Sequence, residues 1–205
     1  SLYQHRKPLV SAIALALMAG SMAIPATGWA ATDCNAVTEI PKTQCQALVS
    51  LYTSTNGAKW TDAATNNWNV TNTPCSWKGV VCSGSNVTEL NRASAGLAGP
   101  LPDLSALTGL QSLQLRHNTS LTGDIAILKG LTNLRVLHLG YTGVRGFLGD
   151  LSTLTQLEEL VMDVAPLSTP MPDLASFKKL RILNLWQSGM IGLIPSSLSS
   201  LTNLE

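Results

Sequence analysis

The sequence predicts an α/β solenoid, a curved right-handed superhelix with a parallel sheet on its concave side and a helical, disulfide-bonded cap at its N-terminal end. Two observations lead to this prediction. Leucine recurs at a regular spacing between residues 87 and 205, and all four cysteines lie before the first repeat. A repetitive array needs such a cap, because its first coil would otherwise expose leucines and an unpaired strand edge.

The repeat is clearest between Leu107 and Gly123, where the residues follow the frame L-x-x-L-x-x-L-x-L-x-x-N-x-(x)-L-x-G. The central L-x-L alternates as a strand does, and the flanking leucines lie three residues apart, as in a tight coil. The frame returns at Leu131–Gly146, Leu154–Thr169 and Phe177–Gly192. Self-similarity at a period of about 23 or 24 residues is typical of a leucine-rich-repeat solenoid.

Five coils follow this frame, at residues 87–110, 111–134, 135–157, 158–180 and 181–204. Leu204 and Glu205 would open a sixth coil, without a cap after them. A solenoid that stopped there would expose its last leucines. We therefore expect the chain to be truncated at the start of a sixth coil and to belong to a longer protein.

The frame's asparagine position is poorly kept. Only the second coil has asparagine there, Asn118, whereas the other coils have Ala95, Thr142, Ala165 and Ser188. An asparagine side chain can bond the backbone of neighbouring coils, and alanine cannot. We therefore expect a patchy polar ladder, with some backbone groups bonded elsewhere.

Arg92 stands at a core leucine position of the first coil. An unpaired guanidinium in the core would cost several kcal/mol, about 3–5 where a buried pair loses one member. Arg92 is therefore expected to reach solvent at the cap boundary or to pair with an acid. The leucine pattern alone predicts that Arg92→Leu raises the melting temperature, and a drop would reveal a partner.

Residues 1–30 are expected to be a secretory signal peptide. His5, Arg6 and Lys7 form a basic start, Leu9–Ile24 is apolar or small, and Ala30 precedes the expected cleavage point. An uncleaved membrane anchor is the alternative, but the apolar run is shorter than the roughly 20 residues that a spanning helix needs. We expect a protein that is secreted or held at the cell surface, or periplasmic in a bacterial host.

Residues 31–86 are expected to form the cap. A helix with its stop is predicted over residues 38–57, since Cys45, Leu48, Val49 and Tyr52 recur at helical spacing. Four cysteines in an exported chain suggest two disulfides, with three pairings open. We favour Cys34–Cys45 and Cys75–Cys82, because local pairs close short loops. A zinc site is disfavoured, because the sequence has no Cys-x-x-Cys.

The cap also carries a family resemblance. CQALVSLYTSTNGAKW at residues 45–60, TPCSWKGVVC at residues 73–82 and VTEL at residues 87–90 together resemble the N-terminal cap of plant-type leucine-rich-repeat proteins and their bacterial counterparts. In plants, this cap occurs in receptor-kinase ectodomains and polygalacturonase inhibitors. The resemblance implies that each coil has a concave strand and a convex turn or short 3₁₀ helix. The alanine-rich leader favours a bacterial source.

The cap contains three tryptophans, and the sequence indicates a role for only one of them. Trp77 is expected to fill the core between the helix and the first coil. For Trp60 and Trp68, core filling and an aromatic binding platform both stay open.

The candidate binding surface consists of the residues that flank the L-x-L leucines, because alternate strand residues point away from the core. They form three columns across the concave face: Glu89, Ser112, Val136, Glu159 and Ile182; Asn91, Gln114, His138, Val161 and Asn184; Ala93, Arg116, Gly140, Asp163 and Trp186. The mixture of polar, aromatic and aliphatic groups, including Val136, Val161 and Ile182, suits a protein or peptide ligand. The candidate binding residues are Gln114, Arg116, His138, Tyr141, Asp163, Asn184 and Trp186.

Composition and motifs narrow the function class. Loss of Arg6 and Lys7 with the leader leaves 11 of the 13 basic residues against 12 acidic ones, without a basic run, which argues against nucleic acid. We expect no cofactor and no enzyme activity within this chain. The one weak catalytic option is a dyad of His138 and Asp163, which Ser112 would have to complete.

We therefore expect an exported, non-enzymatic recognition module that binds a protein or peptide on its concave face. One alternative is the ectodomain of a larger surface receptor or enzyme whose activity lies after Glu205. Another is an inhibitor of a secreted glycan hydrolase, which only the family resemblance suggests. A glycan that stacks on Trp186 is a further open ligand class.

Overall fold

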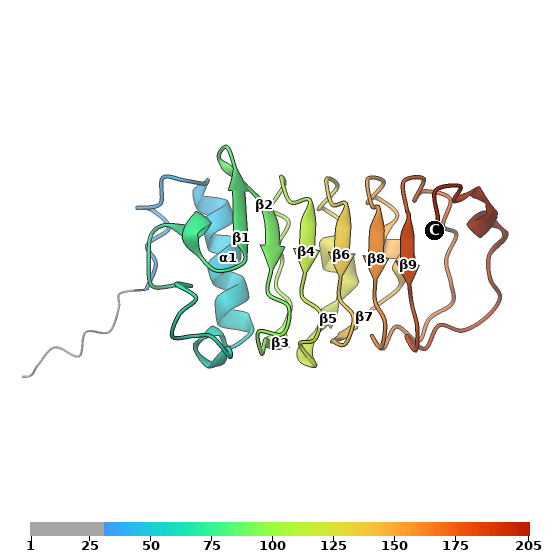
Figure 1. Cartoon of the computed structure of the whole chain (residues 1–205), viewed down its shortest axis with the longest axis horizontal. Coiled ribbons are helices and arrows are strands. Elements are labelled where there is room, and N and C mark those ends of the chain that lie inside the picture. The colour runs from blue at the N-terminus through green and yellow to red at the C-terminus, as the bar shows by residue number, and fades with distance from the viewer. Residues whose placement is uncertain (1–30) are drawn as a thin grey trace, which may run out of the picture.

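The computed structural model describes residues 31–205. The signal peptide expected at residues 1–30 lies outside the described residues. Figure 1 shows a row of parallel strands that continues from a helical cap at the N-terminal side, with one strand for each coil. The predicted solenoid and its cap are confirmed.

The larger sheet contains six strands in the order β1-β2-β4-β6-β8-β9. Its strands are β1 (Val80–Ser83), β2 (Asn86–Asn91), β4 (Ser112–Gln114), β6 (Val136–His138), β8 (Glu159–Val161) and β9 (Ile182–Asn184). Strand β1 belongs to the cap and pairs antiparallel with β2, whereas all later neighbours are parallel. The cap therefore covers the open edge of the first coil, as the sequence predicted.

A second, smaller sheet was not predicted from the sequence. It contains β3 (Ala98–Pro100), β5 (Ser120–Asp124) and β7 (Gly143–Arg145), in that order and parallel. Three 3₁₀ helices lie farther along their coils: η3 (Ile125–Leu128), η4 (Leu148–Leu151) and η5 (Ser196–Ser200). Each of these coils thus has the short 3₁₀ helix that the resemblance implied.

The core is a continuous stack of leucines. The leucines of the repeat frames that begin at Leu107, Leu131 and Leu154 are at most 3% exposed. Among them are Leu107, Leu110, Leu113, Leu115, Leu131, Leu134, Leu137, Leu139, Leu154, Leu157 and Leu160. Because each coil packs mainly on its neighbours, stability accumulates along the array rather than around one centre.

The cap helix α1 (Lys42–Ser54) begins after Pro41 and ends before Asn56, which has a left-handed backbone (φ 59°). Proline suits a helix start, and asparagine tolerates the left-handed region better than most residues. Gln44 is buried on the inner face. Its amide donates to Asn86 at 2.7 Å and accepts from the Val87 backbone at 2.9 Å, which ties the helix to β2.

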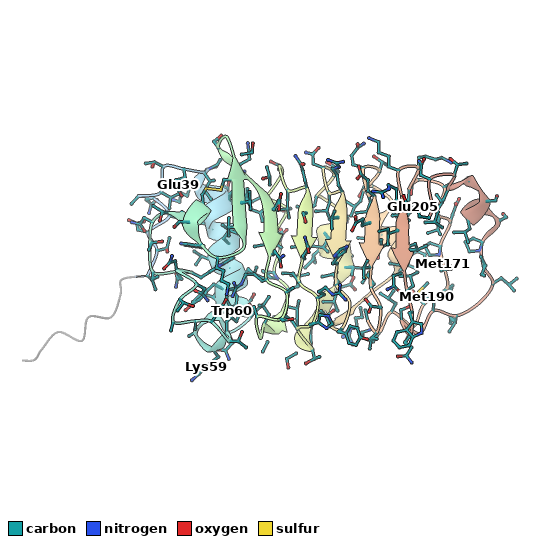
Figure 2. All side chains as sticks on the ribbon, in the orientation of Figure 1. Glu39, Lys59, Trp60, Met171, Met190 and Glu205 are labelled. Carbon is teal, nitrogen blue, oxygen red and sulfur yellow. A yellow bond between two sulfur atoms is a disulfide. The ribbon has the colours of Figure 1, made fainter. Side chains whose placement is uncertain are left out.

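Both predicted disulfides, Cys34–Cys45 and Cys75–Cys82, are present. The second lies beside the short helix η2 (Pro74–Ser76). There the Cys75 backbone N–H donates to the Glu39 carboxylate at 3.0 Å, and Figure 2 shows Glu39 at this end of the molecule. The two bridges thus fix the chain on both sides of α1.

The three cap tryptophans belong to the core. Trp60, Trp68 and Trp77 are at most 3% exposed. Neighbouring ring centroids lie 5.1 Å and 5.0 Å apart, and Tyr52 extends the row by an edge contact with Trp60 at 5.5 Å. The three rings are therefore not a binding platform, and Figure 2 places Trp60 beside the cap helix.

Arg92 has the acidic partner that the sequence left open. It is 2% exposed, and its guanidinium donates two hydrogen bonds to Asp62 and a third, at 3.3 Å, to the Lys78 carbonyl. Its charged end also lies 4.6 Å from the centroid of the Trp60 ring. The pair joins the cap loop to the first coil, so Arg92 holds the junction together.

Burial raises the pKa of the Asp62 carboxyl, but hydrogen bonds from Arg92, Lys78 and Asn66 outweigh that effect. The net result is a pKa well below the usual aspartate range. Asp62 is therefore charged in the folded protein, and its pairing stabilises the fold wherever the carboxyl is ionised.

The polar ladder is patchy, as expected. Asn118 bonds across coils: its amide donates to the Arg92 carbonyl at 2.9 Å, and its carbonyl oxygen accepts from the Leu97 N–H at 3.0 Å. The hydroxyl of Thr142 donates only within its own coil, to Leu139 at 2.7 Å, and that of Ser188 does the same to Leu185 at 2.6 Å. Asn118 is thus the one ladder residue with a side chain bonded to the preceding coil.

Candidate binding surface

The first two predicted columns match the strand register. Glu89 pairs with Ser112, and the series continues through Val136, Glu159 and Ile182. Asn91 pairs with Gln114, followed by His138, Val161 and Asn184. Strand neighbours of this kind lie about 4.8 Å apart, so each column brings together residues from distant parts of the chain.

The third column continues the ladder beyond the strand ends. The backbone N–H of His117 donates to the carbonyl of Gly140 at 2.9 Å, and that of Tyr141 donates to Asp163 at 2.8 Å. The N–H of Val164 donates to Trp186 at 2.8 Å. The backbone at this edge of the face is therefore held in register from coil to coil.

A fourth column follows the third, and sequence reasoning missed it. Its members share a left-handed backbone with φ between 50° and 60°: Ser94, His117, Tyr141, Val164 and Gln187. Only glycine, asparagine and aspartate adopt this region readily, so the strain marks a required bend at the end of each concave strand. The His117 and Tyr141 rings stack at 4.8 Å between centroids.

Trp186 is the large exposed side chain of the face. It is 59% exposed, and its backbone N–H donates to the Asn184 side chain at 3.1 Å. Gln114, farther along the second column, donates to the Ser112 hydroxyl at 3.1 Å. Trp186 therefore offers the broad apolar area, and the neighbouring columns offer polar groups.

The expected exposure of Val161 was wrong, and the weak catalytic option at His138 does not form. Val161 is only 8% exposed, so the apolar area of the second column is smaller than expected. His138 does not lie against Asp163, because its Nε2 is 3.0 Å from the Glu159 carboxylate. The dyad of His138 and Asp163 is therefore not formed.

Arg116 and Asp163 flank Gly140 in the third column. Asp163 is 6% exposed, and its Oδ1 occupies the space above Gly140, 1.9 Å from where a Cβ would be. Within residues 31–205, this oxygen has no hydrogen-bond donor, and the buried Nε of Arg116 has no acceptor. The sequence pointed to both residues, but only the structure shows their unpaired atoms.

Over residues 31–205, no three His, Cys, Asp or Glu side chains gather closely enough to bind a metal ion. In the same range, no helix has the length and apolarity needed to cross a membrane.

Comparison with known proteins defines the class of this fold. The leucine-rich-repeat N-terminal domain family matches residues 41–83, which contain the whole of α1 and β1. Pollen receptor-like kinase 1 of Arabidopsis thaliana is 30% identical over 160 residues, which cover 64% of this chain and 24% of the relative. The chain spans no more than 24% of the length of any of the first three curated relatives it matches.

Solved plant structures share the same architecture. The leucine-rich-repeat ectodomain of the Arabidopsis receptor kinase SOBIR1 has a TM-score of 0.65 at 26% identity, over 81% of this chain and 90% of that one. The BIR3–SERK2 complex of Arabidopsis has a TM-score of 0.62 at 26% identity, and the match covers 77% of this chain and 87% of that one. The plant peptide hormone receptor RGFR1, solved with RGF2, has a TM-score of 0.51 at 28% identity, and the match covers 54% of this chain and 18% of that one.

The chain therefore has the fold and the N-terminal cap of plant-type leucine-rich-repeat proteins and is similar to plant receptor ectodomains. The expected bacterial source receives no support, because the relatives and structures named above are plant proteins.

Proposed function

We propose that residues 31–205 form an extracellular, non-enzymatic recognition module that binds a protein or peptide on its concave face. The observation that carries this proposal is the combination at the strand ends of an exposed Trp186 with the unpaired polar groups of Arg116 and Asp163. Aromatic and arginine side chains are the commonest energetic anchors of protein interfaces.

The comparisons support the same class of ligand. RGFR1 is a plant peptide hormone receptor solved in complex with RGF2, and BIR3 and SERK2 form a complex with each other. These are properties of those proteins, and they favour a peptide or protein over a glycan here. In our proposal the module is part of a larger receptor, since the curated relatives are much longer than this chain.

A peptide selection tests the proposal directly. Immobilised residues 31–205 would be exposed to a phage-displayed library of random linear peptides, and the Kd of each selected peptide would be measured against wild type and variants. We expect Trp186→Ala to raise the Kd at least tenfold, as hot-spot truncations commonly do. Arg116→Ala should raise it by a smaller factor.

Phe147→Ala is the matched control. Phe147 is also an exposed aromatic residue, at 42%, but it precedes η4 and lies outside the strands of the larger sheet. Its truncation should change the Kd less than twofold. Selected peptides that lose affinity with Phe147→Ala and keep it with Trp186→Ala would show that the concave face is not the binding surface.

A further inference from the structure

Two residues of opposite charge, Arg116 and Asp163, flank Gly140 in the third column, and each has a buried polar atom without a partner. The Oδ1 of Asp163 and the Nε of Arg116 are each shielded from solvent, and neither has a hydrogen-bond partner within residues 31–205. Buried polar atoms are nearly always paired in folded proteins. An unpaired donor and an unpaired acceptor at neighbouring positions therefore point to a ligand group that supplies both.

The geometry depends on glycine at position 140. An ideal Cβ there would lie 1.9 Å from Asp163 Oδ1 and 2.9 Å from its Cγ, so any larger side chain would displace the carboxylate. The backbone of the three residues is fixed, because His117 donates to Gly140 and Tyr141 donates to Asp163. Arg116 and Asp163 are two strands apart, about 10 Å between their main chains.

The charges select the class of ligand group. A cation would suit Asp163 but would be repelled by Arg116, and an anion would meet the reverse situation. A neutral amide presents a C=O that accepts from the Arg116 Nε–H and an N–H that donates to the Asp163 carboxylate. Hydrogen bonds with one charged partner are also stronger than those between neutral groups.

We propose that Arg116, Gly140 and Asp163 form an amide-binding site, here called the Gly140 site, that receives an amide of a bound peptide. The amide is either a main-chain peptide group or the side-chain carboxamide of Asn or Gln. The inference rests on the proposed function only for the source of this amide. The stacked rings of His117 and Tyr141, adjacent to this site along the chain, border it.

The test uses small amides as probes and needs no peptide ligand. The Arg Nε–H resonances of ¹⁵N-labelled residues 31–205 would be followed by NMR during titration with N-methylacetamide, which mimics the main chain, and with propionamide, which mimics a side chain. Arg116→Lys assigns the Arg116 signal by its loss. The buried Nε of Arg92 provides an internal reference, because it lies in the cap junction.

We expect one or both amides to shift the Arg116 Nε–H signal saturably, with half-saturation on the order of 10–100 mM for ligands this small. The Arg92 signal should stay fixed. Gly140→Ala should raise half-saturation at least tenfold, because the added Cβ displaces the carboxylate. Gly130→Ala is the matched control, since a Cβ there meets only Ser105 at 3.4 Å, and it should leave the titration unchanged.

Three results would overturn the inference. If acetate shifts the Arg116 signal as strongly as the amides do, the site is a plain anion site. A signal that moves with Asp163→Asn, but with neither amide, would indicate a direct pair of the two side chains. A Gly140→Ala protein that binds amides like wild type would remove the proposed geometry. The peptide selection is independent, so peptides that depend on Trp186 but not on Gly140 would leave the proposed function standing.

Discussion

Replacement of Arg92 by leucine tests how the cap is joined to the first coil. The substitution removes two hydrogen bonds to Asp62, one to the Lys78 carbonyl and the contact with the Trp60 ring. Breaking a buried ion pair by loss of one member costs about 3–5 kcal/mol. The cost is smaller here because the Asp62 side chain is 17% exposed and keeps its 2.9 Å contact with Lys78.

A buried leucine would also return about 1–2 kcal/mol of apolar burial. The net expectation is a loss of about 2 kcal/mol, or roughly 4–8 °C in melting temperature for a domain of this size. Thermal unfolding followed by circular dichroism measures this change. The melting temperature of Arg92→Lys should lie between those of wild type and Arg92→Leu, since lysine keeps the charge but loses the bidentate contact with Asp62.

The double variant Arg92→Leu/Asp62→Asn separates pairing from packing. If the cost comes from the carboxylate left behind, neutralising Asp62 should recover part of the loss, and the two substitutions will not be additive. A melting temperature of Arg92→Leu equal to or above that of wild type would refute the reasoning. It would mean that the leucine pattern, and not the ion pair, decides stability at this position.

Three further predictions concern stability. Asn118→Ala should lower the free energy of unfolding, measured by chemical denaturation, by about 2–4 kcal/mol, because it leaves buried backbone groups of two coils unpaired. Thr142→Ala should lower it by only about 1 kcal/mol. Equal losses would contradict the coil-bridging role of Asn118. The lowered pKa of Asp62 means that its stabilisation is complete above the unfolded-state pKa of about 4 and is lost as the pH falls below it. Asp62→Asn should therefore flatten the acid limb of a pH-stability curve, and an unchanged limb would rule this out. Val164→Asn should raise stability by about 1 kcal/mol, because a β-branched residue is strained at φ 59°, and a loss would show that its packing matters more.

Much of the fold could be predicted because leucine spacing reports directly on burial. The L-x-L pairs defined the strands, and the register then followed, since each coil contributes one strand at the same point. The cysteine pairs were also predictable, because each closes a short loop of the cap. The smaller sheet could not be predicted, as β3, β5 and β7 contain few β-formers and pair through their backbone.

The candidate site was predictable only in part. The column positions of Arg116, Asp163 and Trp186 followed from the period of two in a strand. The burial of Asp163 could not be predicted in this way. It depends on the absence of a side chain at Gly140, which lies in the coil before that of Asp163. The partner of Arg92 was hidden for a similar reason, since Asp62 lies 30 positions earlier in the chain, in a cap loop whose path the leucine pattern does not predict.

The fourth column is marked in the sequence only by its position in each coil. Its residues share no chemical type, and the left-handed bend is imposed by the fold rather than chosen by glycine or asparagine. The stack of His117 and Tyr141 arises at this bend. A search for recurring positions, rather than recurring residues, would have included His117.

The central claim is that the concave face around Trp186 is the binding surface, and fluorescence quenching tests it most directly. Trp60, Trp68 and Trp77 are buried, whereas Trp186 is 59% exposed, so acrylamide quenching of residues 31–205 should report mainly on Trp186. Trp186→Phe should remove the quenchable component. A peptide from the displayed library, added at saturation, should protect that component in the wild-type protein. Peptide binding that leaves the quenching of Trp186 unchanged would contradict the claim.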